Sequence, residues 1–422
     1  MAAFVLLCLV ISTLKQAGAA PGPSLAGHHS GSNTTFKEAA TGQPRTDAAT
    51  DQQHAAEREQ QFLSWLSQEG ASFESIRLGR SAAGLRGVFA AANLSKGDLL
   101  VAVPHHVILK LPYSSNDDFC EQGEALMLAL LQRDPAHVAH LDVLPTLEES
   151  RMSPDTFHLP RSYWKLLQSE VAESFILNQR AALLQYWRRH QQRLQPLGAS
   201  LELLRYTLWL TASRTFNYNE THFSLVPLVD MTNHVNGCPT VHSDKPCPNN
   251  PSETCFIIRA GAAIAAGNEV CNGYGYLRND EAFLHYGFNL DEQQAAELLF
   301  VVDRHDASME ALAGVGYRAE TRPPHFFRTR AALQAEQQRL QRRLQELQRG
   351  DAKAGSWPRA LQDSSGVILQ QLLQWRRLRQ QAITNELARL HDALLELHTG
   401  GNDRSTASAA AQVQQRTARD EL

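Results

Sequence analysis

Two groups of short strand-like runs, separated by a long helical stretch, restrict the fold of this 422-residue chain more than any other feature. Between residues 76 and 109, glycines interrupt short apolar runs, which is typical of strands joined by tight turns. A helical spacing of apolar residues extends from about Gly123 to Arg214, with Trp164, Trp187 and Trp209 as candidate core anchors. Strand-like runs return at Phe223–Val229, Cys255–Arg259 and Glu269–Asn272. The pattern therefore predicts an α+β fold in which a helical insertion, at about residues 120–213, interrupts a module of short strands.

Helical segments are expected on both sides of this module. Before it, Ala56–Gln68 has an apolar face and Gly70 follows as a stop, so we expect order to begin near Ala55. After it, leucines spaced by three and four residues predict two amphipathic helices within an all-helical C-terminal domain at residues 291–400. Each apolar run is too short to indicate a coiled coil. The apolar positions are Leu333, Leu340, Leu344, Leu347, Ile383, Leu387, Leu390, Leu394 and Leu397.

The two ends of the chain resemble signals that direct a protein to a cellular compartment. Residues 1–19 are similar to a secretory signal peptide, with an apolar run from Ala2 to Leu14 and a cleavage site after Ala19, although the usual basic start is missing. Arg419–Leu422 resembles the Lys-Asp-Glu-Leu retention signal at the end of an expected flexible tail, residues 401–422. Together the ends favour the endoplasmic reticulum lumen, with plastid or cytosol as alternatives if the N-terminal signal is misinterpreted.

Residues 20–54 are rich in Ala, Gly, Ser, Thr and Pro, which predicts a disordered linker. Sequons for glycosylation begin at Asn33, Asn93 and Asn219, but such triplets are common and support a lumenal location only slightly. A net charge of −4 disfavours a generally basic nucleic-acid binder. The chain has no stretch of 18 apolar residues, so we expect no membrane span.

Three segments carry residues suited to chemistry. The first is a glycine-rich turn at Gly84–Ala90. The second comprises Ser213–Phe216 and Leu225–His234, and the third comprises Gly267–Tyr276 and His285–Asn289. Each segment alone has an ordinary structural explanation, because glycines turn the chain and an Asn-His pair usually caps or hydrogen-bonds. A purely structural explanation does not account for the combination and order of all three segments.

In this order the segments resemble the SET-domain protein methyltransferases, and within them the branch of the Rubisco large-subunit lysine methyltransferase and the actin-histidine methyltransferase. The similarity covers roughly residues 58–295 and rests on Ser-Arg-x-Phe, Pro-Leu-x-Asp-Met-x-Asn-His and the Tyr-Gly that precedes Tyr-Gly-Phe. It implies a SET β-fold with a long helical insertion, here residues 55–290, followed by a helical substrate-binding domain. It also implies S-adenosyl-L-methionine as the cofactor.

The resemblance assigns roles to individual residues. The tyrosine matching Tyr274 is catalytic, and the one matching Tyr286 helps to line the methyl-transfer channel. The arginine matching Arg214 reaches the cofactor carboxylate, and the pair matching Asn233 and His234 bonds the adenine and amino-acid ends of the cofactor. The expected cofactor-binding residues are Gly87, Val88, Phe89, Arg214, Asp230, Met231, Asn233, His234, Tyr286 and Phe288.

Methyl transfer from a sulfonium to a neutral amine explains these residue types. The reaction is an in-line displacement, so the protein must mainly position the reactants. A tyrosine hydroxyl and backbone carbonyls can orient the methyl group and the amine and stabilise the charge of the transition state. Desolvation and the nearby sulfonium lower the pKa of the accepting lysine. No metal is required, and we expect none.

Two positions indicate which side chain accepts the methyl group. The histidine-methylating member of the branch carries Asn two residues after the cofactor arginine and Trp before the Asp-Met pair, where this chain has Phe216 and Val229. An apolar wall suits the methylene stem of lysine, so we expect a protein-lysine N-methyltransferase. A histidine N-methyltransferase and a catalytically silent SET module with a lumenal partner are the alternatives. We expect a protein substrate, bound by the SET groove and the C-terminal domain, and a retention receptor for the tail.

A cysteine-containing insertion follows the Asn-His pair. Cys238, Cys247 and Cys255 lie close together in a proline-rich segment, and His234 or His242 could complete a zinc site. The spacing fits no familiar zinc pattern, and an oxidising lumen favours a disulfide. We therefore expect at least one disulfide among these three cysteines, with the pairing left open.

Overall fold

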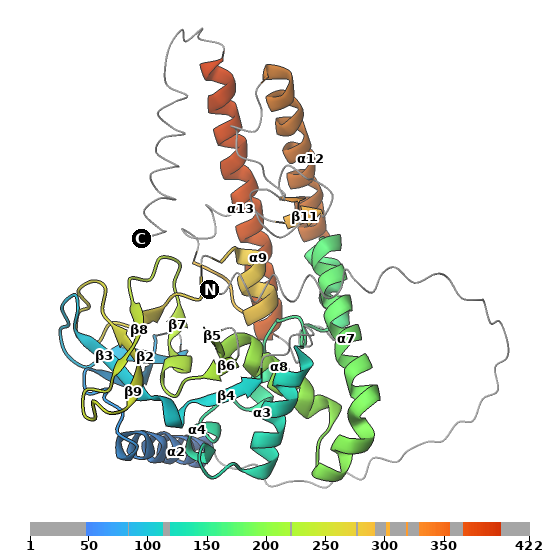
Figure 1. Cartoon of the computed structure of the whole chain (residues 1–422). Coiled ribbons are helices and arrows are strands. Elements are labelled where there is room, and N and C mark those ends of the chain that lie inside the picture. Colours follow the sequence, from blue (N-terminus) through green and yellow to red (C-terminus); the bar gives the residue numbers. More distant parts are fainter. Residues whose placement is uncertain are drawn as a thin grey trace, which may run out of the picture.

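The computed structural model describes residues 48–82, 84–112, 119–219, 222–275, 277–291, 301–303, 318–319, 329–354 and 366–397. The signal peptide, most of the predicted linker, Asn33 and the C-terminal tail lie outside these residues. The fold is α+β, as predicted. Figure 1 shows the short strands gathered on one side of the molecule, while two long helices stand side by side and project away from them.

The first helix, α2 (Ala48–Gln68), begins earlier than the sequence indicated. The expected start was near Ala55, so the end of the predicted disordered linker is helical. Alanine and glutamine in this stretch are good helix formers, which the low hydrophobicity of the linker obscured. Phe62 and Leu66 are completely buried and attach the helix to the β module. Gly70 has a φ of 86° and ends the segment as expected.

The strands form several small sheets. The first is the antiparallel pair of β1 and β2, and the others have the orders β3-β9-β8, β4-β6-β5 and β10-β7. Strands that precede the helical insertion therefore pair with strands that follow it, so the insertion leaves and re-enters one β module. The bounds are β1 (Ile76–Arg80), β2 (Arg86–Ala90), β3 (Leu99–Pro104), β4 (Leu109–Pro112), β5 (Phe216–Asn219), β6 (His222–Leu225), β7 (Asn233–His234), β8 (Val241–Pro246), β9 (Thr254–Arg259) and β10 (Cys271–Asn272).

The insertion has its own hydrophobic core. Trp164, Trp187 and Trp209 are all buried, as predicted for core anchors. A Cβ on Gly123 would lie 2.6 Å from Leu208 Cδ2, so the glycine allows α3 and α8 to pack closely. Its helices are α3 (Cys120–Gln132), α4 (Val138–Leu141), α5 (Leu147–Arg151), α6 (Trp164–Leu167), α7 (Glu170–Leu194) and α8 (Leu201–Arg214), with 3-10 turns η2 (Arg161–Tyr163) and η3 (Gln195–Leu197). Two further 3-10 turns lie in the β module, η1 (His105–Val107) before the insertion and η4 (Val229–Met231) after it.

The C-terminal helices α12 (Arg330–Ala354) and α13 (Gly366–Glu396) pack along their apolar faces. The buried contacts come from the predicted positions Leu333, Leu340, Leu347, Ile383 and Leu390. The region is not all-helical, because β11 (Val301–Asp303) and β12 (Arg318–Ala319) form a short antiparallel pair. The β-branched Val-Val pair in β11 favours the extended conformation, a signal too short to detect in the sequence.

Two buried arginines of α13 fasten this pair of helices to the insertion. Arg379 donates from Nη1 to the carbonyl of Leu167 at 2.7 Å, and Arg376 donates to the carbonyl of Leu166. The ring of Trp375 stacks on Phe283 at 5.4 Å. Phe283 belongs to the π-helical turn η5 (Ala282–Tyr286), which follows the short helix α9 (Asn279–Glu281). The C-terminal helices are thereby held against the segment that carries Tyr286.

Candidate active site

Strands β7 and β10 run parallel and bring two of the three motif segments into contact. Cys271 lies in register with Asn233, and Asn272 lies in register with His234. The first segment joins them, since Val270 donates its backbone N–H to Val88 O at 2.7 Å. All three motif segments therefore meet. Gly87, Val88 and Phe89 do not form the expected turn: they lie in β2, because Gly87 pairs with Gly79 in the β1–β2 ladder.

Asn233 and Gly87 make one tight contact region with Glu269. The Asn233 amide donates from Nδ2 to Arg86 O at 3.0 Å and to Glu269 Oε1 at 2.6 Å. A Cβ on Gly87 would lie 2.4 Å from Glu269 Oε1 and 3.0 Å from Asn233 Nδ2, so a larger residue would displace these side chains. Glu269 is exposed, and its carboxylate presents oxygen atoms to solvent beside the Asn233 amide.

The two ring nitrogens of His234 have different partners. Nδ1 accepts the backbone N–H of Tyr274 at 3.1 Å, and Nε2 donates to Asn236 Oδ1 at 2.9 Å. A nitrogen that accepts a hydrogen bond carries no proton, so His234 is the neutral Nε2–H tautomer. Burial lowers the pKa of His234, which favours the same neutral form. The ring thus fixes the backbone at Tyr274 without adding positive charge.

Tyr274 donates its hydroxyl to Thr232 O at 2.6 Å. Burial raises the pKa of Tyr274 to about 12, so the hydroxyl stays protonated at neutral pH. Its ring lies 5.1 Å from the His234 ring and 5.4 Å from the Tyr286 ring, centroid to centroid. Phe288 lies 6.0 Å from both His234 and Tyr286. These four rings, His234, Tyr274, Tyr286 and Phe288, form what we call the aromatic cluster.

The turn η5 places Tyr286 in this cluster. Its π-helical hydrogen bonding is rare and is often found at functional sites. Burial raises the pKa of Tyr286, and it lowers the pKa of the neighbouring His285 to about 4. The turn is tied to the insertion because Thr156 donates its backbone N–H to Leu284 O at 2.9 Å. Both tyrosines of the cluster are therefore neutral, and both are held by backbone contacts.

Arg214, at the end of α8, is directed toward the second motif. Its Nη1 donates to Asp230 O at 2.6 Å, while its buried Nε has no hydrogen-bond partner among the described residues. The Asp230 carboxylate faces the insertion, with His140 Nε2 3.1 Å from Oδ2 and both side chains fully buried. Burial, and next the nearby Arg214, lower the pKa of Arg86, which donates to Val143 O at 2.7 Å. Arg86 also lies 3.9 Å from Glu59, so the positive charges of Arg86 and Arg214 lie near each other with an acidic side chain beside them.

Residues 85–275 match the family model of the SET domain. This part of the chain is a SET domain. Among solved structures, the SET domain of LSMT bound to lysine and AdoHcy matches with a TM-score of 0.53 and 14% identity, over 81% of this chain and 92% of that chain. Rubisco LSMT bound to AdoMet matches with a TM-score of 0.54 and 14% identity, over 81% and 93%.

Rubisco LSMT bound to sinefungin and monomethyllysine matches with a TM-score of 0.52 and 15% identity, over 81% of this chain and 93% of that chain. Comparison with curated protein sequences finds no match. The structural likeness extends beyond the SET domain into the helical C-terminal region. At these identities it establishes a shared fold, so the chemistry must be argued from the site itself.

The remaining residues expected in the SET-domain site have mixed positions. Met231 and Val229 are buried in the hydrophobic core, so Val229 does not form an open wall beside a substrate. Phe216 is partly exposed and packs on Phe256, with ring centroids 6.0 Å apart. The side chain of Asp230 serves the insertion, and only its carbonyl faces Arg214.

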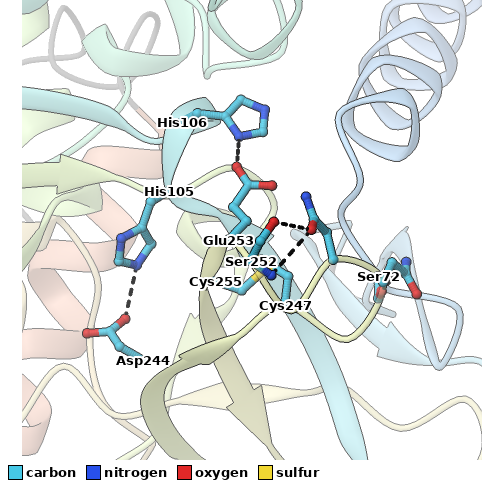
Figure 2. Close-up of a disulfide and its surroundings, with 10 residues drawn as sticks. Ser72, His105, His106, Asp244, Cys247, Ser252, Glu253 and Cys255 are labelled. Carbon is cyan, nitrogen blue, oxygen red and sulfur yellow. Dashed lines mark hydrogen bonds and ion pairs between the residues drawn. A yellow bond between two sulfur atoms is a disulfide. The ribbon is translucent and has the colours of Figure 1, made fainter.

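The SET domain contains two disulfides. Cys247 pairs with Cys255, two of the three expected candidates, whereas Cys238 pairs with Cys271 in β10. Figure 2 shows the Cys247–Cys255 bond near two polar contacts, His106 with Glu253 and His105 with Asp244. The sequence did not suggest Cys271 as a partner, because it lies outside the cysteine-containing insertion.

Three further features bear on expected sites and partners. Asn93 is exposed and Asn219 ends β5. The described part of the chain contains no group of three or more His, Cys, Asp or Glu side chains arranged to hold a metal ion. Within the described ranges, no helix combines the length and apolar character that a membrane crossing requires.

Sequence reasoning missed three residues of the site. Glu269 and Arg86 belong to quoted motifs but were given no role, and only the contact of β2 with the third segment reveals one. Asn236 is the third: it accepts the Leu277 N–H at 2.8 Å, donates to Leu277 O at 2.9 Å and also accepts from His234. It therefore holds the backbone of Leu277, three residues after Tyr274, and links it to His234. An Asn two residues after an Asn-His pair was the available signal.

We predict that Asn236→Ala loosens this segment. Removing the amide leaves the Leu277 backbone and His234 Nε2 without their partner, which should cost about 1–3 kcal/mol. Hydrogen exchange at the Leu277 amide should accelerate, and the midpoint of denaturant unfolding should fall. Asn250→Ala, which removes an exposed contact with Ser252, is the matched control and should change neither quantity much. Unchanged exchange at Leu277 in Asn236→Ala would contradict the assignment.

Proposed function

We propose that the chain is a protein-lysine N-methyltransferase that uses S-adenosyl-L-methionine. The observation that carries the proposal is the hydroxyl of Tyr274, which donates to Thr232 O at 2.6 Å within the aromatic cluster of a SET domain. The similar solved structures support it, since their names record LSMT with lysine, monomethyllysine, AdoMet and AdoHcy.

The residues present fit this cofactor. The unpartnered Nε of Arg214 and the nearby Arg86 suit a carboxylate. The exposed Glu269 carboxylate suits an ammonium or hydroxyl group, and Gly87 leaves room beside the Asn233 amide. When bound, S-adenosyl-L-methionine supplies an electrophilic methyl group on a positively charged sulfur. In this proposal Arg214, Asn233 and Glu269 hold the molecule, and Gly87 allows its close approach.

The aromatic cluster provides the surroundings that the transfer needs. The four rings are partly buried, and the desolvation of an entering lysine, together with the positive charge of the sulfonium, lowers the pKa of its amine. His234 is neutral and does not oppose the approach of a positively charged donor. The Tyr274 oxygen and the Thr232 carbonyl are fixed dipoles that can orient the amine and stabilise partial positive charge in the transition state. Positioning and desolvation, rather than proton abstraction by a side chain, are the contributions of this site.

The acceptor and its protein are also part of the proposal. Phe216 packs with Phe256 and lies 6.5 Å from the ring of His242, an environment that favours the apolar stem of lysine over a second imidazole. The helices α12 and α13 are proposed to bind the substrate protein, because Arg376 and Trp375 fix them to the insertion and to η5.

Calorimetric titration with S-adenosyl-L-methionine tests the proposed function. The intact chain should bind it, and Arg214→Ala and Asn233→Ala should each weaken binding by roughly 1–3 kcal/mol, about 5- to 150-fold in Kd. Arg193→Ala, which removes an ion pair with Glu124 on the surface of the insertion, is the control and should bind normally. Wild-type affinity in both site variants would contradict the assignment, and no binding by the intact chain would reject the proposal.

Tyr274→Phe should reduce kcat by about a hundredfold or more while cofactor affinity is retained, because the hydroxyl acts mainly in the transition state. The control is Tyr206→Phe. The Tyr206 hydroxyl also donates to a carbonyl, Pro145 O at 2.7 Å, and burial raises the pKa of Tyr206 to about 12, but this residue lies in the insertion. A Phe variant with the wild-type rate would exclude this role.

The rate should depend on pH in one direction only. Because the pKa of Tyr274 is raised to about 12, the rate should rise with pH as the substrate lysine deprotonates, and no fall from ionisation of Tyr274 is expected below about pH 12.

We also propose that the protein works in the endoplasmic reticulum lumen, with a retention receptor that reads Arg419–Leu422. The signal-like residues 1–19 and the two disulfides, which suit an oxidising compartment, support this location. A chain tagged between residues 20 and 47 should stay in the endoplasmic reticulum, and the same chain ending before Arg419 should be secreted. Glycan on Asn93 would independently report entry. A cytosolic or plastid signal from the full chain would overturn the proposal.

A further inference from the structure

The Cys238–Cys271 disulfide joins the two chain segments that form the aromatic cluster. Cys238 follows His234 by four positions and Cys271 precedes Tyr274 by three. The sulfur atoms connect residues 33 positions apart, with their Cα atoms 6.0 Å from each other. The bond thus closes a loop at the place where the third motif segment pairs with the Asn-His segment.

The other contacts between these two segments are all noncovalent, and two of them, Asn233 with Glu269 and the Tyr274 hydroxyl with Thr232 O, are described above. The β7–β10 ladder contains two residue pairs, and a short parallel pair is weak by itself. Val235 donates its N–H to Asn272 O at 3.1 Å, and the Tyr274 N–H reaches His234 at 3.1 Å. Asn236 adds its contacts with Leu277. A covalent link beside these noncovalent contacts restricts how far the two segments can separate.

We propose that this disulfide positions Tyr274 against His234, so that the methyltransferase is active when Cys238 and Cys271 are oxidised and loses activity when they are reduced. The inference rests on the proposed function for its activity readout. Reduction by a dithiol breaks the S–S bond and adds two electrons and two protons, which yields two cysteine thiols and one disulfide of the reductant. The freed segments are then held together by hydrogen bonds and by the packing of the His234 and Tyr274 rings.

The second disulfide is a built-in control. Cys247–Cys255 closes only eight positions, and both cysteines are buried against Ala102 and Ile257 rather than against the aromatic cluster. Its loop is also fastened from outside by the contact of His106 with Glu253 (Figure 2). Asn249 adds a hydrogen bond to Ser72 Oγ at 2.9 Å. Cys238 and Cys271 are both partly exposed, so a soluble reductant should reach them first.

The first experiment compares the full chain with Cys238→Ser/Cys271→Ser and Cys247→Ser/Cys255→Ser, all produced in a secretory host. Small displacements of reacting groups cost about a hundredfold in rate, so the first variant should lose kcat on that order, while the second should show a lower Tm with kcat little changed. Hydrogen exchange at the Tyr274 amide should accelerate in the first variant only. That readout does not depend on methyl transfer.

The second experiment titrates the wild-type protein with dithiothreitol and follows activity, far-ultraviolet circular dichroism and thiol labelling by peptide mapping. Activity should fall as Cys238 and Cys271 become labelled, before Cys247 and Cys255, with the circular dichroism retained, and should return on reoxidation. Full activity together with slow Tyr274 exchange, in protein whose Cys238 and Cys271 are reduced, would overturn the inference. An oxidised wild type that binds no S-adenosyl-L-methionine would reject the proposed function, while the exchange at Tyr274 would still decide the positioning role.

Discussion

The parallel pairing of β7 with β10 is the contact on which the site depends. It places Asn233 and His234 beside a segment that enters from the far end of the β module and continues to Tyr274. The hydrogen bond from the Tyr274 backbone to His234 is possible only in this register, and that bond also sets the tautomer of the imidazole. The position of the Tyr274 backbone and the protonation state of His234 therefore both depend on the pairing of β7 with β10.

The helical insertion supports the same site from its other side. His140 of α4 lies 3.1 Å from the carboxylate of Asp230, and both side chains are fully buried. Removing either partner would therefore lower the free energy of unfolding substantially. Asp230 in turn offers its carbonyl to Arg214. The insertion thus anchors the turn that separates the arginine from Asn233. It also carries the carbonyls that receive Arg376 and Arg379, which makes it the common support for the site and the C-terminal helices.

Local patterns in the sequence predicted the order of strands and helices, because burial periodicity is a property of neighbouring residues. The leucines of α12 and α13 and the three tryptophans of the insertion were identified in this way. Contacts between distant residues were not predictable from such patterns. The partner of Cys238 lies 33 positions away and the partner of Asp230 lies 90 positions away. The approach of Glu269 to Gly87 of β2 was equally hidden, because the two residues are far apart in the sequence.

The distribution of charge around the site separates its two tasks. Charged groups, Arg86, Arg214 and Glu269, lie on the side formed by β2 and the end of α8, where they can satisfy the polar ends of a cofactor. The aromatic cluster, on the side of η5, contains only neutral groups, because burial raises the pKa of both tyrosines and lowers the pKa of His234. The charged side chains suit the polar ends of a cofactor, and the neutral cluster suits an amine that must lose its proton. The Tyr274 segment links the two regions, since it begins beside Glu269 and ends among the rings.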